Sequence, residues 1–284
     1  MKKLAAIAVA SFMAVSLLAG CTDGGSGDGS SAASDGSTGT AALTGTVKMS
    51  GSTSMETIAK ALAEGFMAKN SGVTVDVQLG GSSVGVADAQ SGKSDIGNVS
   101  RELKDTETGL KANEIAIDGI AVALNNDNPV KNLTKDQLTK IYTGEIKNWK
   151  EVGGEDAAIV VIAREASSGT REAFEDILGI KGKVKASQEK NETGAVKTAV
   201  QTTKNAIGYV SLEAIGDGAV TAAKIDGVEA TEENIKSDAY ILARPFVMAT
   251  KESGVSDVAQ AFIDYVLSDE GQTIVKNNKL ISVK

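Results

Sequence analysis

The segment at residues 164–171, Arg-Glu-Ala-Ser-Ser-Gly-Thr-Arg, contains residue types that could bind an anion. Arg164 carries a planar guanidinium with five donors, which suits the oxygens of an oxyanion. Ser168 and Thr170 add hydroxyl groups, and Gly169 lets a ligand come close to backbone N–H groups. Together these groups predict an anion cradle. A serine N-cap beside two surface arginines is the alternative that this segment alone leaves open.

The elements predicted around this segment would place its donors at the start of a helix. Residues 157–163 form an apolar run rich in β-branched side chains, which predicts a buried strand. Residues 172–179 alternate apolar and charged side chains and end in glycine, which is typical of a surface helix. The first N–H groups of a helix are unpaired, and the helix dipole favours negative charge there.

Glycine- and hydroxyl-rich turns of the same kind follow other predicted strands, at residues 46–49, 73–79 and 94–101. After the first two turns, helices are predicted at residues 55–69 and 86–91. Because ligands of open α/β sheets bind beyond the carboxyl ends of the strands, we expect these turns to meet. The further candidate ligand residues in them are Ser54, Ser82, Ser83, Ser100 and Arg101. For Arg101, a salt bridge with Glu102 or another nearby carboxylate is the alternative.

The composition excludes several kinds of site. The chain of 284 residues has no histidine and one cysteine, which excludes Ser-His-Asp triads, histidine-ligated metals and cysteine-cluster metals. Its formal net charge of -8 disfavours a nucleic-acid surface. The full phosphate-loop pattern and the Gly-x-Gly-x-x-Gly fingerprint are absent from the sequence, so a small oxyanion is a better candidate ligand than a nucleotide. We expect neither a metal nor a cofactor.

The N-terminal sequence predicts a signal peptide followed by a flexible tether. Two lysines precede an apolar run at residues 4–18, which is shorter than the roughly 20 residues of a membrane span and suits a signal peptide at residues 1–20. Small residues before Cys21 resemble the bacterial lipoprotein box, which implies cleavage before this cysteine and attachment of lipid to its sulfur. An ordinary signal peptide with an incidental cysteine is the alternative. The Gly/Ser-rich composition of residues 21–43 predicts a flexible tether.

The remainder of the chain resembles the phosphate-binding lipoproteins of bacterial phosphate ABC importers. The stretches that carry the resemblance are residues 50–55, 80–83, 95–101, 138–149 and 164–170. The resemblance implies an α/β fold of the periplasmic-binding-protein type II, with the ligand cleft between two lobes joined by two hinge crossings. Lobe 1 would comprise residues 44–124 and 243–284, and lobe 2 would comprise residues 125–242. The spacing of apolar residues predicts a terminal helix at residues 256–267, which we expect to pack on lobe 1.

The same resemblance implies roles for individual residues. Phosphate would meet Ser54, the Met55 N–H group and Ser82 from lobe 1, and Arg164, Ser168, Gly169 and Thr170 from lobe 2. Some members of the family place an aspartate where Ser100 stands, and another acidic position falls on Ala166. A hydroxyl repels fully ionised sulfate less than a carboxylate does, so these residues predict oxyanion binding and leave the choice between phosphate and sulfate open.

The function implied is that of a binding protein and not an enzyme. The protein would be lipid-anchored on the extracytoplasmic face of the cell membrane, capture inorganic phosphate and deliver it to the membrane subunits of an ABC permease. Alternatives are the binding of another tetrahedral oxyanion such as sulfate or molybdate, an anion sensor and, more remotely, a surface phosphatase. A nucleic-acid partner is not expected.

Overall fold

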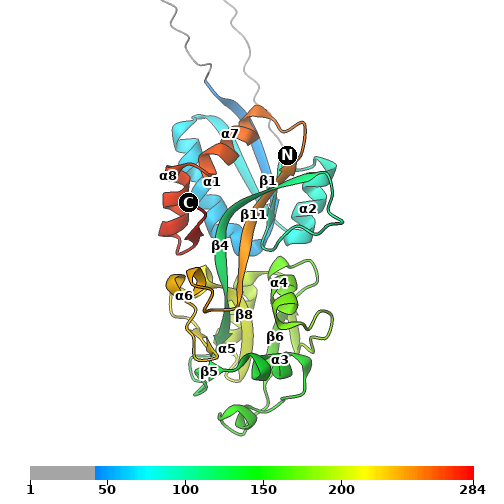
Figure 1. Cartoon of the computed structure of the whole chain (residues 1–284), viewed down its shortest axis with the longest axis vertical. Helices are drawn as coiled ribbons and strands as arrows, with labels where there is room; N and C mark the ends of the chain where they lie inside the picture. The colour runs from blue at the N-terminus through cyan, green and yellow to red at the C-terminus, as the bar shows by residue number, and fades with distance from the viewer. Residues whose placement is uncertain (1–41) are drawn as a thin grey trace, which may run out of the picture. The chain divides into compact units, whose positions relative to one another are not determined.

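The computed structural model describes residues 42–284, in which helices and strands alternate along much of the chain (Figure 1). The predicted signal peptide at residues 1–20 and the predicted lipidation site at Cys21 lie outside the described residues, as does nearly all of the predicted tether at residues 21–43. Within residues 42–284, none of the helices combines the length and the apolar character that a membrane span requires.

Parallel strands and the helices between them build the first lobe. The strand β1 (Thr44–Gly51) lies between β2 (Gly72–Leu79) and β3 (Ile96–Val99) and is parallel to both. The helices that connect them are η1 (Thr53–Met55), α1 (Glu56–Lys69) and α2 (Ser82–Ser91). The C-terminal part of the chain adds α7 (Asp257–Val266), α8 (Asp269–Asn277) and β12 (Ile281–Ser282). Apolar residues of α1 and α7 share one core with β1, so the terminal helix packs on this lobe as predicted.

Two long antiparallel strands, β4 (Leu110–Leu124) and β11 (Ala243–Lys251), connect the lobes (Figure 1). The strand β4 pairs with β11 up to Gly119, and residues 120–124 pair instead with a strand of the second lobe, β8. The predicted lobe boundary at residue 124 falls at the end of β4, whereas the change of partner falls at Ile120. One continuous strand therefore belongs to the sheets of both lobes.

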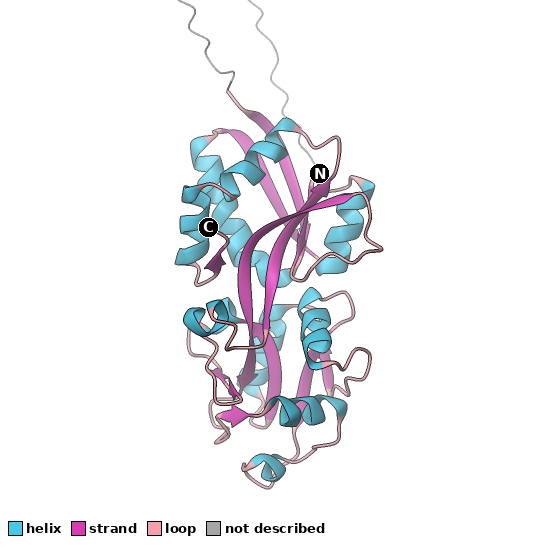
Figure 2. Ribbon diagram, viewed as in Figure 1, coloured by secondary structure: helices cyan, strands magenta, loops and turns pink. Residues whose placement is uncertain are grey.

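The second lobe repeats the same construction around β8. Its strands are β5 (Asn132–Leu133), β6 (Val160–Arg164), β7 (Gln188–Lys190), β8 (Ala206–Ser211), β9 (Thr221–Ala222) and β10 (Lys224–Ile225). Its helices are α3 (Lys135–Thr143), η2 (Trp149–Val152), α4 (Gly169–Leu178), α5 (Thr193–Thr202), η3 (Leu212–Ile215) and α6 (Glu232–Lys236). The strand β6 is parallel to β7 and β8, and helices flank the strands of both lobes (Figure 2). The predicted α/β class is confirmed.

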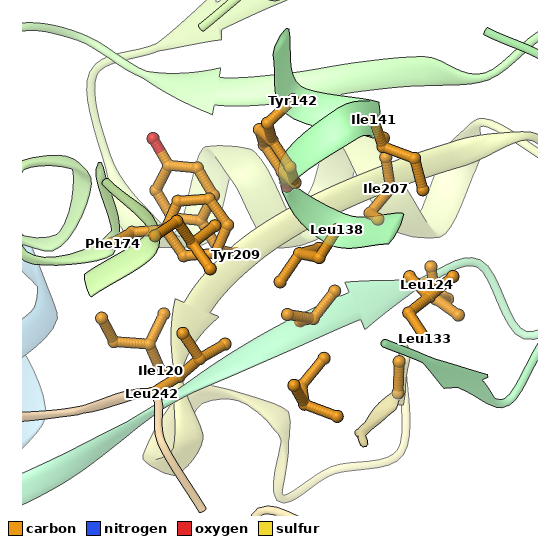
Figure 3. Close-up of a cluster of buried hydrophobic side chains, with 14 of the residues drawn as sticks. Ile120, Leu124, Leu133, Leu138, Ile141, Tyr142, Phe174, Ile207, Tyr209 and Leu242 are labelled. Atoms are coloured by element: carbon orange, nitrogen blue, oxygen red, sulfur yellow. The ribbon is translucent and has the colours of Figure 1, made fainter. Parts of the chain in front are cut away.

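An aromatic group in the second core supports the strand and helix that carry the candidate cradle (Figure 3). The rings of Phe174 in α4 and Tyr209 in β8 stack with centroids 4.3 Å apart, and Tyr142 of α3 meets Phe174 edge-on at 4.7 Å. All three residues are buried. Buried aromatic pairs of this kind contribute about 0.5–1.5 kcal/mol beyond the burial of their area, so they stabilise the packing of α4 against β8 and α3.

The helices begin earlier than their apolar patterns predicted. The pattern predicted a helix from residue 86, but α2 already begins at Ser82, directly after Gly81 with its positive φ of 85°. Likewise α4 begins at Gly169 rather than at Glu172, because the Ser168 hydroxyl accepts a hydrogen bond from the Arg171 N–H and caps the helix. The polar turns of the sequence are therefore the first turns of helices.

Close packing of α2 on β3 depends on Gly97. A Cβ atom at this position would lie 2.4 Å from the carbonyl oxygen of Gly85 in α2, which is backbone and cannot turn away. We expect Gly97→Ala to lower the free energy of unfolding by about 1–3 kcal/mol, as overpacking does. The matched control is Gly194→Ala at the start of α5, where an added Cβ meets nothing within 4 Å and the change should stay within about 1 kcal/mol. Urea unfolding of both variants tests this, and equal midpoints would contradict the packing argument.

Candidate functional site

The starts of η1, α2, α4 and α5 meet between the two lobes. Ser54 of η1 and Thr170 of α4 are both buried, and their hydroxyl oxygens lie 2.6 Å apart. The Ser54 hydroxyl also lies 3.3 Å from that of Thr193, the first residue of α5. Ser82, the first residue of α2, packs against Gly169. Because helix starts offer unpaired N–H groups and partial positive charge, the junction favours an anion.

Hydroxyl groups of the first lobe continue from this junction. The Ser52 hydroxyl donates to the hydroxyl of Ser100 over 2.9 Å, and that of Ser82 lies 3.2 Å from the same oxygen. The Ser100 N–H donates to the Ser82 hydroxyl over 3.0 Å. We call the following buried residues the hydroxyl cluster: Ser52, Thr53, Ser54, Ser82, Ser100, Thr170 and Thr193.

Thr53 and Thr193 bind each other across the lobes in two ways. Their hydroxyl oxygens lie 3.2 Å apart, and the Thr193 N–H group donates to the Thr53 hydroxyl, also over 3.2 Å. A hydroxyl both donates and accepts, so these contacts can be exchanged for contacts to an anion by rotation of a side chain. The cluster is therefore a set of adaptable donors supplied by both lobes.

Two glycines allow the loops of the lobes to approach this closely. A Cβ atom on Gly169 would lie 2.2 Å from the Ser82 hydroxyl and 2.9 Å from that of Ser100. Gly81 has a φ of 85°, and a Cβ atom there would lie 2.8 Å from the Ser167 carbonyl oxygen. Beside it, the Ser83 N–H donates to the same carbonyl over 3.1 Å. The contact between the lobes requires glycine at both positions.

Arg164 brings a buried positive charge to the cluster. Its side chain and backbone together are 1% exposed. One terminal nitrogen, Nη1, donates to the Thr193 hydroxyl over 3.2 Å, and the other, Nη2, donates to the Asn191 carbonyl over 2.9 Å. Within residues 42–284, Nε has no hydrogen-bond partner and no carboxylate lies within ion-pair distance of the guanidinium. Burial lowers the pKa of Arg164 to about 10, so the group is charged at neutral pH.

The backbone of Arg164 is fixed by its neighbours. The Arg164 N–H donates to the buried Tyr209 hydroxyl over 3.0 Å. Its carbonyl accepts from the guanidinium of Arg171 over 2.7 Å, and Arg171 is itself paired with Glu175 and Glu189. Arg171, the second arginine of the predicted segment, therefore stabilises the end of β6 through its hydrogen bond to the Arg164 carbonyl. Its charge is paired with glutamates, so Arg164 is the arginine that contacts the hydroxyl cluster.

The structure brings together most of the side chains that the sequence singled out. Those in or directly beside the hydroxyl cluster are Ser54, Ser82, Ser100, Arg164, Ser168, Gly169 and Thr170. The side chain of Met55 lies in the core of the first lobe, and its N–H donates to the Ser52 carbonyl over 3.2 Å. Ser83 meets the second lobe through its N–H group.

Arg101 is directed elsewhere. Its Nη1 and Nη2 atoms donate to the two carboxylate oxygens of Glu107 over 2.8 and 2.7 Å, and Nη1 also donates to the Glu102 carbonyl over 2.8 Å. Its Nε forms an ion pair with Glu172 of the second lobe. Because Glu107 and Glu172 already compensate the charge of this guanidinium, we leave Arg101 out of the candidate anion site.

Three hydroxyl residues of the cluster did not emerge from the sequence as ligand candidates: Ser52, Thr53 and Thr193. The sequence around Thr193 could have identified it as a candidate, because Thr193 is followed by Gly194 and begins α5 shortly after the end of β7. This is the same strand, hydroxyl, glycine and helix order as at the other turns. The strand β7 is short and polar, and for that reason its pattern does not stand out.

A cleft of about 460 Å³ opens beside the cluster. Thr53, Ser54 and Thr193 are among the residues that line it. Glu213 of the second lobe lines it as well, and both of its carboxylate oxygens are buried without a hydrogen-bond partner among the described residues. Burial raises the pKa of Glu213 to about 7, and the nearby charge of Asp118 adds to the shift.

A buried ion pair lies on the connecting strands close to this cleft. Asp118 of β4 accepts from Arg244 of β11 over 2.8 Å and from the Ser211 hydroxyl over 2.9 Å. Burial raises the pKa of Asp118 to about 6, although the positive charge of Arg244 partly offsets the effect. The pair fixes the two crossing strands to the end of β8. In the described part of the chain, no group of acidic residues has the arrangement of a metal site.

The raised pKa of Glu213 predicts a pH-dependent stability. The folded protein retains this proton up to about pH 7, whereas the unfolded chain releases it near 4.5, so the free energy of unfolding falls as pH rises between these values. Glu213→Gln should therefore raise the free energy of unfolding above pH 7, by at most about 3 kcal/mol, and the gain should fade towards pH 4.5.

Chemical denaturation between pH 4.5 and 8.5 measures this effect. The matched control is Glu233→Gln, an exposed glutamate of α6. An identical pH profile for wild type and Glu213→Gln would refute the assignment.

Comparison with known proteins places this geometry in a family. A family model described as a PBP superfamily domain matches residues 36–270. The phosphate-binding protein PstS of Bacillus subtilis is 33% identical over 277 residues, covering 95% of this chain and 92% of that protein. The corresponding PstS of Staphylococcus epidermidis is 32% identical over 295 residues, covering 96% and 87%.

Solved structures agree with this assignment. A Clostridium perfringens protein, assigned as a phosphate ABC transporter substrate-binding protein and solved with bound phosphate, has a TM-score of 0.83 and 47% identity, covering 84% of this chain and 100% of that one. An ABC-type phosphate transport receptor from Vibrio cholerae has a TM-score of 0.70 and 35% identity, covering 83% and 99%. The chain therefore belongs to the PBP superfamily, within the family of phosphate-binding proteins named PstS.

Proposed function

We propose that the protein binds inorganic phosphate between its lobes and delivers it to the membrane subunits of an ABC importer. The observation that carries this proposal is the buried guanidinium of Arg164, which lacks a carboxylate partner in residues 42–284 and donates to the hydroxyl cluster. A buried charge is costly unless it is compensated, and an anion held by the cluster would compensate it. Relatives named for phosphate binding identify the anion class.

The proposed phosphate contacts come from both lobes. Ser54, with the Met55 N–H group, and Ser82 with Ser83 and Ser100 would bind from the first lobe. Arg164, Ser168, Gly169 and Thr170 would bind from the second lobe, and we add Thr193 because it already bonds to both Ser54 and Arg164. Hydrogen bonds to a charged group contribute about 1.5–3 kcal/mol each, so several of them support micromolar or tighter binding after the cost of closure.

The proposed site discriminates between anions chiefly through hydroxyl groups. Ser100 is buried, bonds to Ser52 and Ser82, and stands where some relatives are expected to carry an aspartate. A hydroxyl can accept the proton of hydrogen phosphate, but it can also donate to sulfate. Sulfate is therefore the competitor to test. If sulfate competes strongly with phosphate, the protein is better described as a receptor for tetrahedral oxyanions in general.

The relatives are binding proteins, and a phosphatase reading finds little support in this chain. The sequence contains no histidine to serve as a general acid or base. The hydroxyls of the cluster bond to one another and to Arg164, whereas nucleophilic catalysis requires an adjacent base. We therefore propose binding without catalysis.

Replacing Arg164 tests the binding proposal. We expect Arg164→Met to weaken phosphate binding at least tenfold, because the cluster loses its only buried guanidinium among the described residues while the volume of the side chain is nearly kept. Isothermal titration of the mature protein with phosphate, followed by competition with sulfate, measures the change. The matched control is Lys183→Met, which removes an exposed positive charge from the same lobe. Equal affinities of wild type and Arg164→Met would overturn the role of Arg164.

We further propose that Cys21 is lipidated and that residues 21–43 tether the binding domain, residues 44–284, to the outer face of the cell membrane. In cells that express the full chain, Cys21→Ala should move the protein from the membrane fraction to the soluble or secreted fraction. Ser30→Ala, a change within the same tether, should leave it with the membrane. Fractionation and the mass of the N-terminal peptide report the result, and membrane retention of Cys21→Ala would exclude lipid anchoring at this residue.

A further inference from the structure

A second set of contacts between the lobes lies on α4, beyond the residues proposed to bind phosphate. Glu172 of α4 forms ion pairs with the guanidinium of Arg101 and with the ammonium of Lys104, both in the loop that follows β3. The Arg101 side chain is 5% exposed and that of Glu172 is 13% exposed. Salt screens the Arg101–Glu172 pair little because both charges are well buried, whereas the Lys104 side chain is 42% exposed and its pair with Glu172 is weaker.

Hydrogen bonds within the loop that follows β3 hold Arg101 and Lys104 in place for this contact. Glu107 holds the guanidinium of Arg101 through two hydrogen bonds and accepts from the Lys104 N–H group over 2.9 Å. Burial by itself would lower the pKa of Arg101, but the hydrogen bonds and charges of Glu107 and Glu172 outweigh burial and raise it. Arg101 and Lys104 are thus presented together to the opposite lobe.

These ion pairs between the lobes can break without leaving a buried charge unpaired. If the lobes separate, Arg101 keeps its bidentate pair with Glu107, so no buried charge is left without a partner. Glu172 keeps the ammonium of Lys181, 3.9 Å away in its own lobe, and gains water. Breaking a buried pair usually costs several kcal/mol because one charge stays unpaired, and here that penalty is avoided.

Glu172 also lies one turn from the helix start that carries the proposed phosphate donors Ser168, Gly169 and Thr170. The neighbouring carboxylate of α4, Glu175, is occupied within the lobe by Arg171. Glu172 is therefore the acidic residue by which the first turns of α4 are held against the first lobe.

We propose that Arg101, Lys104 and Glu172 form an ion-pair latch that stabilises the closed arrangement of the lobes and positions the start of α4 for ligand binding. Among the described residues, the latch side chains form no hydrogen bond with the side chains proposed to bind phosphate, so the latch acts through the population of the closed form. When only a fraction of the protein is closed, the apparent dissociation constant rises in inverse proportion to that fraction. The affinity readout rests on the proposed phosphate function, whereas closure can be measured without it.

The test uses Glu172→Gln, with Glu232→Gln as the matched control. Glu232 pairs with Lys236 within the second lobe, so its replacement removes a carboxylate and an ion pair but no contact between lobes. We expect Glu172→Gln to raise the Kd for phosphate about 5- to 150-fold, the usual range for coupling between sites, with most of the change in the dissociation rate. Glu232→Gln should match wild type.

Lobe closure is measured separately by the distance between labels on exposed positions of the two lobes. Glu64→Cys and Lys147→Cys, in a Cys21→Ser background, provide one label per lobe. Glu172→Gln should shift the labels apart under conditions in which the wild-type background is closed, and Lys104→Met should shift them in the same direction. Lys104→Met also keeps the test decisive if Glu172→Gln folds poorly.

Each outcome decides one of the two proposals. Equal closure of wild type, Glu172→Gln and Lys104→Met overturns the latch, as does a wild-type protein that never closes. Wild-type protein that closes but does not bind phosphate overturns the proposed function and leaves the latch supported if the variants open.

Discussion

A buried guanidinium that forms no ion pair with any carboxylate of residues 42–284 is the constraint on which the junction between the lobes depends. Arg164 is almost fully covered and bonds to a carbonyl and a threonine hydroxyl, which are neutral groups. Removing a charge from water costs several kcal/mol, and neutral acceptors return part of that cost. Among residues 42–284, the hydroxyl cluster adds polar groups but contains no acid, and Glu213 lines the cleft beside it. The hydroxyls and helix starts of the junction keep the region polar while leaving the positive charge available.

The chemistry of the site could be read from the sequence where local order carries it. Ser54, Ser82 and Ser168 each follow a strand and begin a helix, so the carboxyl-end rule for open sheets predicted that they meet. Thr193 obeys the same order but follows a strand of three polar residues, whose pattern is too short to recognise. Arg101 posed a different problem, because its partner Glu172 lies in the other lobe and no local pattern reports such a pairing.

Prediction of the fold likewise succeeded where local sequence patterns define an element and failed where distant segments do. Helices and strands with clear apolar periodicity, such as α1 and β2, were predicted to within a residue or two of their observed ends. Helix starts were predicted too late at α2 and α4, because capping serines and glycines are polar and resemble loops when only apolar spacing is followed. The crossing strands were recognised, but the point at which β4 changes partner depends on register between distant segments. Register of that kind is a tertiary property.

The strand β4 has a consequence for how the chain acquires its structure. Its N-terminal part needs β11 as a neighbour, and β11 is made only after the whole second lobe. The helices α7 and α8 that complete the first core are later still. During synthesis, the first lobe therefore cannot complete its fold until roughly the last forty residues, from the start of β11 onward, have been made. The second lobe can form its own core before that point. An early-terminated chain would leave the N-terminal lobe without its central partner strand, whatever the state of the other lobe.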